Sequence, residues 1–303
     1  MRPYILVIGS SNTDMVVKAE RLPLPGETVL GGRFIMAAGG KGANQAVAAA
    51  RLGADVVFIV KVGDDLFGRQ AIENFKADGI VTDYVITDPV NPSGVALITV
   101  DENAENCIVV ASGANAALMP ADLDRATEVI KNASLILMQL EIPLETVRYV
   151  AELAAQNGVK LILNAAPACA LDDDLLSKVS IITPNQKETE MLTGIKITGR
   201  DSAETGAKAL AAKGIETVIV TMGSEGALLL TGGQFDWIPA RVVKATDTTA
   251  AGDVFNGALA VALSEGKGVM EAVVFACSAA ALSVTKMGAQ SSAPIRSEVD
   301  CFL

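Results

Sequence analysis

Short apolar runs rich in Val, Ile and Leu alternate along this chain with longer segments of helical period. Such runs are typical of strands buried on both faces, and the order strand, helix, strand favours an α/β fold with a mostly parallel central sheet covered by helices. The pattern predicts buried strands at residues 5–8, 56–62, 135–140, 161–164, 181–183 and 218–221. It predicts helices at residues 43–52, 66–78, 123–131, 144–156, 186–192, 203–213, 252–263 and 269–286.

Two stretches interrupt this alternation. Residues 15–18, 29–36, 93–100 and 107–111 have strand patterns with no helix between them, and a polar turn at 101–106 joins the last two as a hairpin. We expect a small, mostly antiparallel sheet, within about residues 14–37 and 93–112, attached to one domain that spans 1–303. Such a sheet beside a ligand cleft would act as a lid or as a contact between subunits.

Composition excludes several kinds of chemistry. The 303 residues include no His, which excludes Ser-His-Asp and Cys-His catalysis and His-ligated zinc. Proton transfer therefore falls to Asp, Glu, Lys, Tyr or Cys. The formal net charge of −11 argues against nucleic-acid binding, which needs a basic face.

The cysteines and the N-terminal segment bear on location. Four scattered cysteines, at 107, 169, 277 and 301, form no C-x-x-C pair and are expected to be reduced thiols. The apolar run at residues 4–9 is too short for a signal peptide, and no run approaches the roughly 20 apolar residues that a membrane helix needs. We expect a soluble, cytoplasmic protein that does not bind membranes.

The segment at residues 245–258 carries the most chemical information. Ala250, Ala251 and Gly252 let the backbone approach a ligand, and the apolar run after Asp253 begins a helix. Unpaired amides at that helix start would form an anion site. The Asp253 carboxylate could then take a proton from a hydroxyl that attacks a bound phosphoryl group. The alternative is that Asp253 only caps the helix.

A second segment, at residues 37–46, places the pair Gly39-Gly40 before Lys41, Gly42 and Asn44. Its spacing is neither that of a P-loop nor that of a dinucleotide-binding turn. Backbone, ammonium and amide donors here would suit a polyhydroxylated substrate. The alternative is a tight turn into a packed helix.

Asn185 and Glu188 come directly after the strand predicted at 181–183. They share one face at the start of the next helix. An amide and a carboxylate at this place suit water-mediated Mg²⁺ binding beside phosphates. The alternative is a capping box, with Asn185 as the N-cap.

Two glycine- or asparagine-rich turns complete the set of candidate ligand contacts. Residues 221–226 form a turn between two strands that either passes a nucleotide or is a simple hairpin. Asn12 and Asp14 follow the first strand, where open α/β sheets form ligand crevices. They would pair with hydroxyls, or form an Asx turn.

In this order, the segments resemble the ribokinase family of carbohydrate kinases along essentially the whole chain. Many members have Gly where this chain has Ala250. The segments that carry the resemblance are Gly9-Ser10, Asn12-x-Asp14, Gly39-Gly40-Lys41-Gly42-Ala43-Asn44, Asn164-Ala-Ala-Pro167, Asn185-x-x-Glu188, Asp247-Thr-Thr-Ala-Ala-Gly-Asp253 and Gly288-Ala-Gln290.

The resemblance implies transfer of the ATP γ-phosphoryl group to the 5-hydroxyl of D-ribose. Asp253 would be the base, and the amides of Ala250, Ala251, Gly252 and Asp253 would form the anion hole. The sugar pocket would contain Asn12, Asp14, Gly40, Lys41, Asn44, Glu141 and Asp253. ATP would contact Asn185, Thr221, Gly223, Ser224, Gly226 and Gly252, and Glu188 with Asn185 would hold Mg²⁺ through water.

A K⁺ site beside the anion hole is also implied by the resemblance. Such an ion would neutralise Asp247 and fix the peptide dipoles that face the phosphate. The alternative is a loop held by hydrogen bonds alone. The implied K⁺ ligands are oxygens of Asp247, Thr249, Ser283, Lys286, Gly288 and Ser292.

Other functions stay open at this stage. Asn12 and Asp14 favour ribose over 2-deoxyribose, because a pocket built to hydrogen-bond a hydroxyl rejects a ligand that lacks it. 2-Deoxyribose and fructose remain candidate substrates. An NAD-dependent oxidoreductase lacks support because no G-x-G-x-x-G follows the first strand. A non-catalytic sugar sensor is a third hypothesis, and a homodimer through the lid sheet is expected by analogy with the family.

Overall fold

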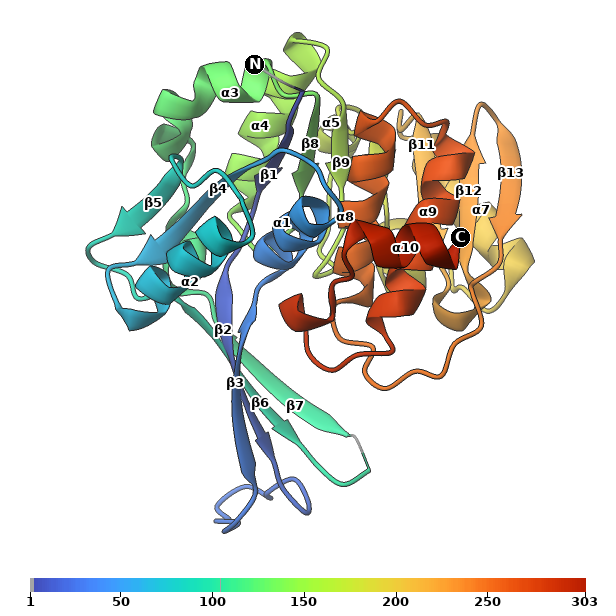
Figure 1. The fold of residues 1–303 in the computed structure, drawn as a ribbon. Helices are drawn as coiled ribbons and strands as arrows, with labels where there is room; N and C mark the ends of the chain where they lie inside the picture. Colours follow the sequence, from blue (N-terminus) through green and yellow to red (C-terminus); the bar gives the residue numbers. More distant parts are fainter. Residues whose placement is uncertain (1–2, 104) are drawn as a thin grey trace.

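A large sheet with helices on both faces and a small projecting sheet make up the computed structural model, which describes residues 3–103 and 105–303 (Figure 1). The α/β class and the separate small sheet predicted from the sequence are confirmed. The strands of the large sheet are β1 (Ile5–Ile8), β4 (Val56–Gly63), β5 (Val85–Asp88), β8 (Leu135–Met138), β9 (Leu161–Leu163), β10 (Ile181–Ile182), β11 (Thr217–Thr221), β12 (Ala227–Thr231) and β13 (Gln234–Ile238). The helices are α1 (Lys41–Arg51), α2 (Leu66–Ala77), α3 (Thr127–Lys131), α4 (Leu144–Gln156), α5 (Asp173–Leu176), α6 (Gln186–Thr193), α7 (Arg200–Ala211), α8 (Ala251–Ser264), α9 (Val269–Ser283) and α10 (Arg296–Phe302).

The large sheet is parallel from β5 to β11 and ends in two antiparallel strands. Its order is β13-β12-β11-β10-β9-β8-β1-β4-β5. In the centre, Ile5 of β1 pairs with Val56 of β4 and with Leu135 of β8. Because the strands run parallel, the residues that follow β1, β8, β9 and β10 meet at one edge of the sheet, where ligands bind in open α/β folds.

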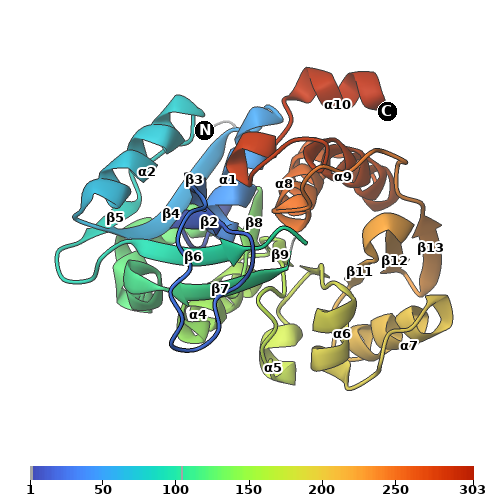
Figure 2. The ribbon, with the colours of Figure 1, turned by 90° about the horizontal axis from the view of Figure 1, so that it is seen from below.

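The side chains of β1 alternate between two apolar clusters, one on each face of the sheet. Ile5 and Val7 pack with α1, α8 and α9, whereas Leu6 and Ile8 pack with α3, α4 and α7. Figure 2 shows these two groups of helices on opposite sides of the strands. Both faces of β1 are therefore buried, as its uninterrupted apolar sequence predicts.

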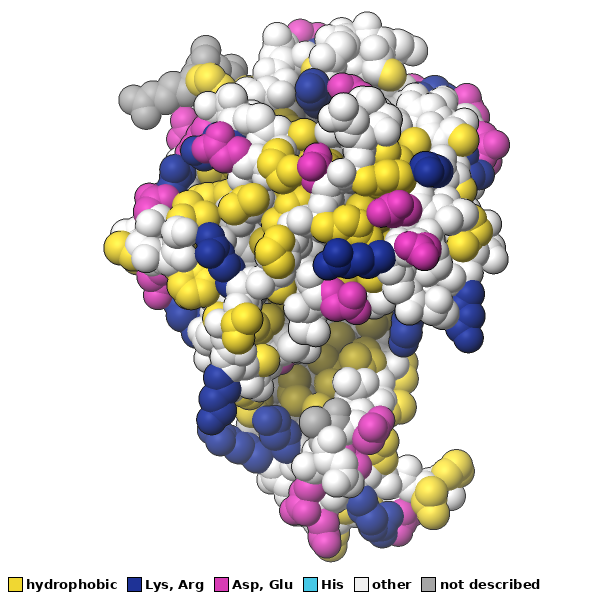
Figure 3. Space-filling model, turned by 90° about the vertical axis from the view of Figure 1, so that its right-hand side faces the viewer, with side chains coloured by type: hydrophobic (Ala, Val, Ile, Leu, Met, Phe, Trp, Pro, Cys, Tyr) yellow, Lys and Arg dark blue, Asp and Glu magenta, His cyan; other side chains and the backbone are white. Residues whose placement is uncertain are grey.

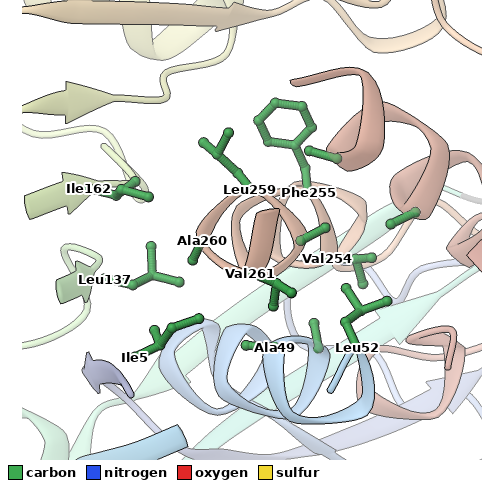
Figure 4. Close-up of a cluster of buried hydrophobic side chains, with 14 of the residues drawn as sticks. Ile5, Ala49, Leu52, Leu137, Ile162, Val254, Phe255, Leu259, Ala260 and Val261 are labelled. Atoms are coloured by element: carbon green, nitrogen blue, oxygen red, sulfur yellow. The ribbon is translucent and has the colours of Figure 1, made fainter. Parts of the chain in front are cut away.

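Helices α1 and α8 pack closely over the centre of the sheet. Figure 4 shows Ala49 of α1 and Leu52, which directly follows α1, facing Val254 and Val261 of α8. A side chain at Gly257 would come within 2.8 Å of the Ala48 Cβ and of the Gln45 carbonyl oxygen. This close approach brings the first turn of α8 beside polar residues of α1.

The small sheet, which we call the lid, projects from the body below α1 and α2 (Figure 1). Its order is β3-β2-β6-β7, and β2 pairs parallel with β6 while the other two pairings are antiparallel. The lid strands are β2 (Asn12–Lys18), β3 (Arg33–Gly39), β6 (Gly94–Val100) and β7 (Asn106–Ala111).

The bounds of the lid strands differ from the prediction, most of all in β2 and β3. β2 begins at Asn12, so Asn12 and Asp14 are strand residues and the Asx-turn alternative is wrong. β3 begins at Arg33 rather than at residue 29, because Gly31 and Gly32 have φ angles of 97° and 105°, which a strand cannot accommodate.

Elements near the edges of the molecule also differ from the prediction. The helix predicted at 123–131 is a 3₁₀ turn, Pro120–Ala126, followed by α3, and the helix predicted at 269–286 ends at Ser283. The sequence pattern missed β5, β13, α5 and α10. These elements are short, and their sequences carry too few apolar repeats to distinguish them from loops.

The hairpin alternative for residues 218–227 is confirmed. β11 and β12 pair antiparallel around a 3₁₀ turn, Gly223–Glu225.

Across residues 3–103 and 105–303, no helix combines the length and apolar character that crossing a membrane requires.

Candidate active site

The first turn of α8 lies at the ligand-binding edge of the sheet. Its N-cap, Ala250, adopts a left-handed conformation with φ of 60°, which turns the chain sharply into the helix. The first in-helix bond runs from the Val254 amide to the Ala250 oxygen, so the amides of Gly252 and Asp253 precede the helical ladder. The Ala251 amide instead donates a long bond of 3.3 Å to the Thr248 oxygen. This turn can therefore donate to an anion mainly through Gly252 and Asp253.

The Asp253 carboxylate is buried, with 6% of the residue exposed. Its Oδ2 accepts a bond of 2.8 Å from Asn44 Nδ2, and its Oδ1 accepts a bond of 3.0 Å from Gln45 Nε2. The side chain thus turns toward α1, and the alternative that Asp253 merely caps its own helix is wrong. Burial raises the pKa of Asp253, while Lys41 and the two amide donors act in the opposite direction.

The predicted sugar-binding residues come from β2, the start of α1 and the loop after β8. Glu141 Oε2 accepts bonds from Ser10 Oγ at 2.5 Å and from the Lys41 amide at 3.0 Å. Asn12 Oδ1 accepts from Asn115 Nδ2 at 2.8 Å. The structure therefore brings segments about 130 residues apart in sequence into one pocket.

Two glycines make room for this pocket. Gly40 has φ of 88°, and a side chain there would come within 2.6 Å of the Asn12 amide nitrogen. A side chain at Gly39 would come within 2.3 Å of Asp14 Oδ2. Glycine is therefore favoured at position 40 by the positive φ angle, and at both positions by the close contact with β2. The alternative of an ordinary tight turn explains neither contact.

Lys41 is the cation of an otherwise acidic pocket. Burial alone would lower the pKa of Lys41, but the neighbouring carboxylates raise it overall. Burial also raises the pKa of Asp14 to about 6, with further contributions from Glu141 and Asp253. The carboxylates that act on Lys41 are Asp253, Glu141, Glu188 and Asp14.

One buried oxygen in this pocket has no protein partner. Asn44 donates to Asp253 through Nδ2, and its Oδ1 is buried without a hydrogen bond. Leaving a buried acceptor unpaired costs free energy, so the oxygen is suited to a donor that a ligand supplies. A sugar hydroxyl at this place would bond Asn44 and lie beside Asp253.

A cavity of about 460 Å³ adjoins the other side of the α8 turn. Of the predicted nucleotide contacts, Thr221, Gly223, Ser224, Gly226 and Gly252 line it. Sequence reasoning missed its apolar wall, because apolar residues there look like ordinary core positions. The missed lining residues include Ala240, Val242, Phe255, Cys277, Ala280, Ala281 and Val284.

Asn185 lies beside this cavity through an isolated parallel bridge with Thr221. The side-chain Oδ1 of Asn185 accepts a bond of 2.9 Å from the backbone amide of Glu188. The backbone amide of Asn185 donates a bond of 2.8 Å to Glu188 Oε2. The capping-box alternative is therefore confirmed. Glu188 Oε1 also accepts from Asn185 Nδ2 at 2.8 Å. Burial raises the pKa of the Glu188 carboxyl.

The loop before α8 is tied to the loop after α9 by Asp247. Asp247 Oδ1 accepts from Thr249 N and Oγ1, and Oδ2 accepts from the Gly288 amide at 2.8 Å. Burial raises the pKa of Asp247, but these donors outweigh it and leave the pKa lowered. Three of the residues expected to bind K⁺, namely Asp247, Thr249 and Gly288, are thus linked by hydrogen bonds.

The other three expected K⁺ residues use their side chains elsewhere. Ser283 and Ser292 donate to the carbonyls of Ala280 and Ala289, and Lys286 pairs with Glu298. Lys286 can offer a cation only its main-chain oxygen, whereas the hydroxyls of Ser283 and Ser292 keep their lone pairs while they donate. In the part of the chain that the structure describes, no cluster of three or more Cys, Asp or Glu side chains is arranged to hold a metal.

The lid overhangs the sugar-binding residues. Figure 3 shows a hollow between the body and the narrow lid, with apolar side chains visible inside it. Ala96 of β6 pairs with Asp14 of β2 and is buried, so the lid continues the wall of the pocket. A buried carboxylate between an amide-rich pocket and a nucleotide-sized cavity defines the class: an α/β kinase with a β-sheet lid.

Comparison with known proteins agrees with this class. The family model described as pfkB family carbohydrate kinase matches residues 2–296. Ribokinase of Haemophilus influenzae is 46% identical over 303 residues, covering 100% of this chain and 99% of the relative. Deoxyribokinase of Salmonella typhimurium is 43% identical over 291 residues, covering 96% and 95%. The structure of Arabidopsis thaliana ribokinase complexed with ribose and ATP gives a TM-score of 0.95 at 33% identity, covering 100% and 99%.

The chain therefore belongs to the pfkB family of carbohydrate kinases, and its resemblance to ribokinases is confirmed. This membership makes the oxidoreductase hypothesis wrong.

Asp14 gives a prediction about pH and stability. Its pKa is raised in the folded protein, so the folded state binds more protons than the unfolded state between about pH 4 and 6. Stability from this group is present below pH 4 and is lost as the pH rises to about 6. Asp14→Asn should raise the free energy of unfolding at about pH 8 by on the order of 1 kcal/mol, after discounting for partial exposure.

Urea denaturation at about pH 4 and pH 8 measures this difference. The control is Asp83→Asn, which replaces an exposed carboxylate and should change neither value. Equal destabilisation of the Asp14 variant at both pH values would contradict the prediction.

Proposed function

We propose that this protein transfers the γ-phosphoryl group of ATP to the 5-hydroxyl of D-ribose, giving ribose 5-phosphate. The observation that carries the proposal is the Asp253 carboxylate, which lies between the sugar-pocket residues and the amides at the start of α8. The ribose and ATP of the Arabidopsis complex and the Haemophilus ribokinase name support it.

On the sugar side, polar groups hold the acceptor in place. Asn12, Asp14 and the Asn44 oxygen bond ring hydroxyls, and Glu141 fixes the Lys41 amide at the pocket edge. Gly40 lets the backbone approach the sugar. The 5-hydroxyl then lies against Asp253, which accepts its proton as the new O–P bond forms. General-base help of this kind is worth roughly 10²–10⁴-fold in rate.

On the nucleotide side, the cavity between the Gly223 turn and α9 holds the base and ribose of ATP. The amides of Gly252 and Asp253 stabilise the charge that develops on the transferred phosphoryl group. Holding donor and acceptor in line contributes on the order of 7–11 kcal/mol to lowering the barrier. Asn185 and Thr221 border the phosphates.

Mg²⁺ accompanies ATP and neutralises phosphate charge. Glu188 and Asn185 fit this role through water, because the capping box holds both side chains still while a carboxylate can accept from metal-bound water as well. The two interpretations of this pair are therefore compatible.

We also propose a K⁺ ion below the 247–253 loop. Asp247 would supply the negative charge, and oxygens of Thr249, Ser283, Lys286, Gly288 and Ser292 would hold the ion. Replacing K⁺ by tetramethylammonium at equal ionic strength should lower kcat on the order of tenfold or more, because the amides at the α8 turn lose their alignment. Equal rates in both salts would show that hydrogen bonds alone hold the loop.

The substrate assay separates the remaining candidates. ATP-dependent phosphorylation is compared for ribose, 2-deoxyribose and fructose, with the product identified by mass. We expect ribose to give the highest kcat/KM. A preference for 2-deoxyribose would favour the second candidate, which the Salmonella deoxyribokinase relative supports. The absence of any sugar phosphate would favour a non-catalytic sensor.

Asp253→Asn tests the base directly in the same assay. The variant keeps the shape of the side chain, so ribose and ATP binding by calorimetry should stay nearly unchanged while kcat falls by about 10²-fold or more. Normal turnover would remove Asp253 from the base role.

A homodimer through the lid is also proposed. The strand register places Met36, Leu97 and Val109 on one face, and each is more than half exposed. Apolar side chains gathered in this way mark contact surfaces. In sedimentation the wild type should have twice the chain mass of 31.2 kDa, and Leu97→Glu should have the single mass.

The control for the dimer is Val90→Glu, an exposed apolar position outside the lid strands, which should stay dimeric. A wild type that sediments at the single mass would contradict the proposal.

The cytoplasmic location stays a prediction. The free thiols of Cys107, Cys169, Cys277 and Cys301 agree with a reducing compartment.

A further inference from the structure

Polar side chains form a buried network that begins at the Asp253 carboxylate. Gln45 of α1 and Gln139, which follows β8, are both fully buried. Asn164, Thr183 and Asn256 are also buried. Amides buried in an apolar core cost free energy unless they are paired, so this concentration needs a physical reason.

The direction of the network is set by the charge of Asp253. An ionised carboxylate only accepts hydrogen bonds, so Gln45 turns its nitrogen toward Asp253 Oδ1 when Asp253 is charged. The second proton of that nitrogen goes to Asn164 Oδ1 at 3.0 Å. Gln45 Oε1 therefore faces Gln139, whose Nε2 donates to it at 2.7 Å. Gln139 thus holds the amide of Gln45 in the orientation that donates to Asp253.

The network also returns to the backbone of the anion-binding turn. Asn164 Nδ2 donates a bond of 3.3 Å to the backbone carbonyl oxygen of Thr183. The side-chain Oγ1 of Thr183 donates a bond of 2.6 Å to Asn256 Oδ1. Asn256 Nδ2 then donates to the Gly252 oxygen at 2.8 Å. A continuous series of bonds therefore links the Asp253 carboxylate to the peptide next to it.

We propose that Gln45, with its amide oriented by Gln139, is a positioning residue that aims the Asp253 carboxylate at the acceptor hydroxyl and fixes it relative to the peptide that joins Gly252 to Asp253. The proposal rests on the kinase function above. It adds residues that touch neither sugar nor nucleotide in the geometry described. Gln45 holds Oδ1, which leaves Oδ2, held by Asn44, as the oxygen nearest the sugar pocket.

Removing the Gln45 donor should change the pH dependence of catalysis. Asp253 must be ionised to accept a proton, and a hydrogen bond to its charged form lowers its pKa. The charged groups that act on it are Lys41, which also lowers its pKa, and Glu141, Asp14 and Glu188, which belong to the same acidic pocket. With these groups unchanged, loss of the Gln45 donor moves the acidic limb of the kcat profile to higher pH.

Gln45→Met tests the proposal with a side chain of similar size and no donor. With the preferred sugar and ATP, kcat should fall about 10- to 100-fold while both KM values stay within about threefold, since preorganised hydrogen bonds act on the chemical step. The acidic limb should move up by about one pH unit.

Two further variants keep the test informative if Gln45→Met folds poorly. Gln45→Glu preserves shape but places a second carboxyl 3.0 Å from Asp253, so its acidic limb should move further than that of the Met variant. Gln139→Met leaves Gln45 in place but removes its orienting donor, and should give a smaller fall in kcat with the limb moved in the same direction.

Thr146→Val is the control. It removes a different buried bond, from Thr146 Oγ1 to the Leu118 oxygen, and should lower stability without moving the pH profile or kcat. Gln45 variants that fold, bind both substrates and keep the wild-type pH profile would overturn the proposal while the kinase function stands. A wild type that phosphorylates none of the sugars would overturn both.

Discussion

The buried charge of Asp253 is the interaction on which the rest of the site depends. A carboxylate at this depth is costly unless donors surround it, and here α1 supplies two amides to its two oxygens. Those donors are in reach only because α1 and α8 pack closely at Gly257. The apolar core between the helices and β1 therefore fixes the position of a reactive group at their ends (Figure 4).

The acidic pocket around Lys41 has a consequence for stability. Burial and the carboxylates of Glu141 and Asp253 raise the pKa of Asp14, and Glu141 adds to the effect of burial on Asp253, so these groups repel one another when they are ionised. Under the proposed function, Asp14 and Asp253 must ionise at neutral pH to bind or deprotonate a sugar, yet burial and mutual repulsion oppose their ionisation. Function and stability oppose each other at these positions.

The two proposed substrates would be bound by different kinds of interaction. Under the proposed function, a neutral sugar would be bound by hydrogen bonds that compensate buried acceptors such as the Asn44 oxygen. Under the same proposal, a triphosphate would be repelled by the net acidic charge of the protein and would rely on local groups such as the α8 amides. The capping box of Asn185 and the bonds of Asp247 keep those local groups rigid.

The sequence by itself determined the α/β class, the central buried strands and the residues at the ends of those strands. Apolar runs and glycine pairs are local patterns, and each follows from the preferences of a few neighbouring residues. Asp253, Asn44 and Glu141 were found in this way or through the family resemblance. The tertiary structure alone decided that Asp253 turns toward α1 instead of capping α8, that Gln45 and Gln139 hold it, and that apolar residues such as Phe255 wall the nucleotide cavity. Those contacts join residues up to 209 positions apart, and no local pattern encodes them, because they form only when helices and strand ends pack together.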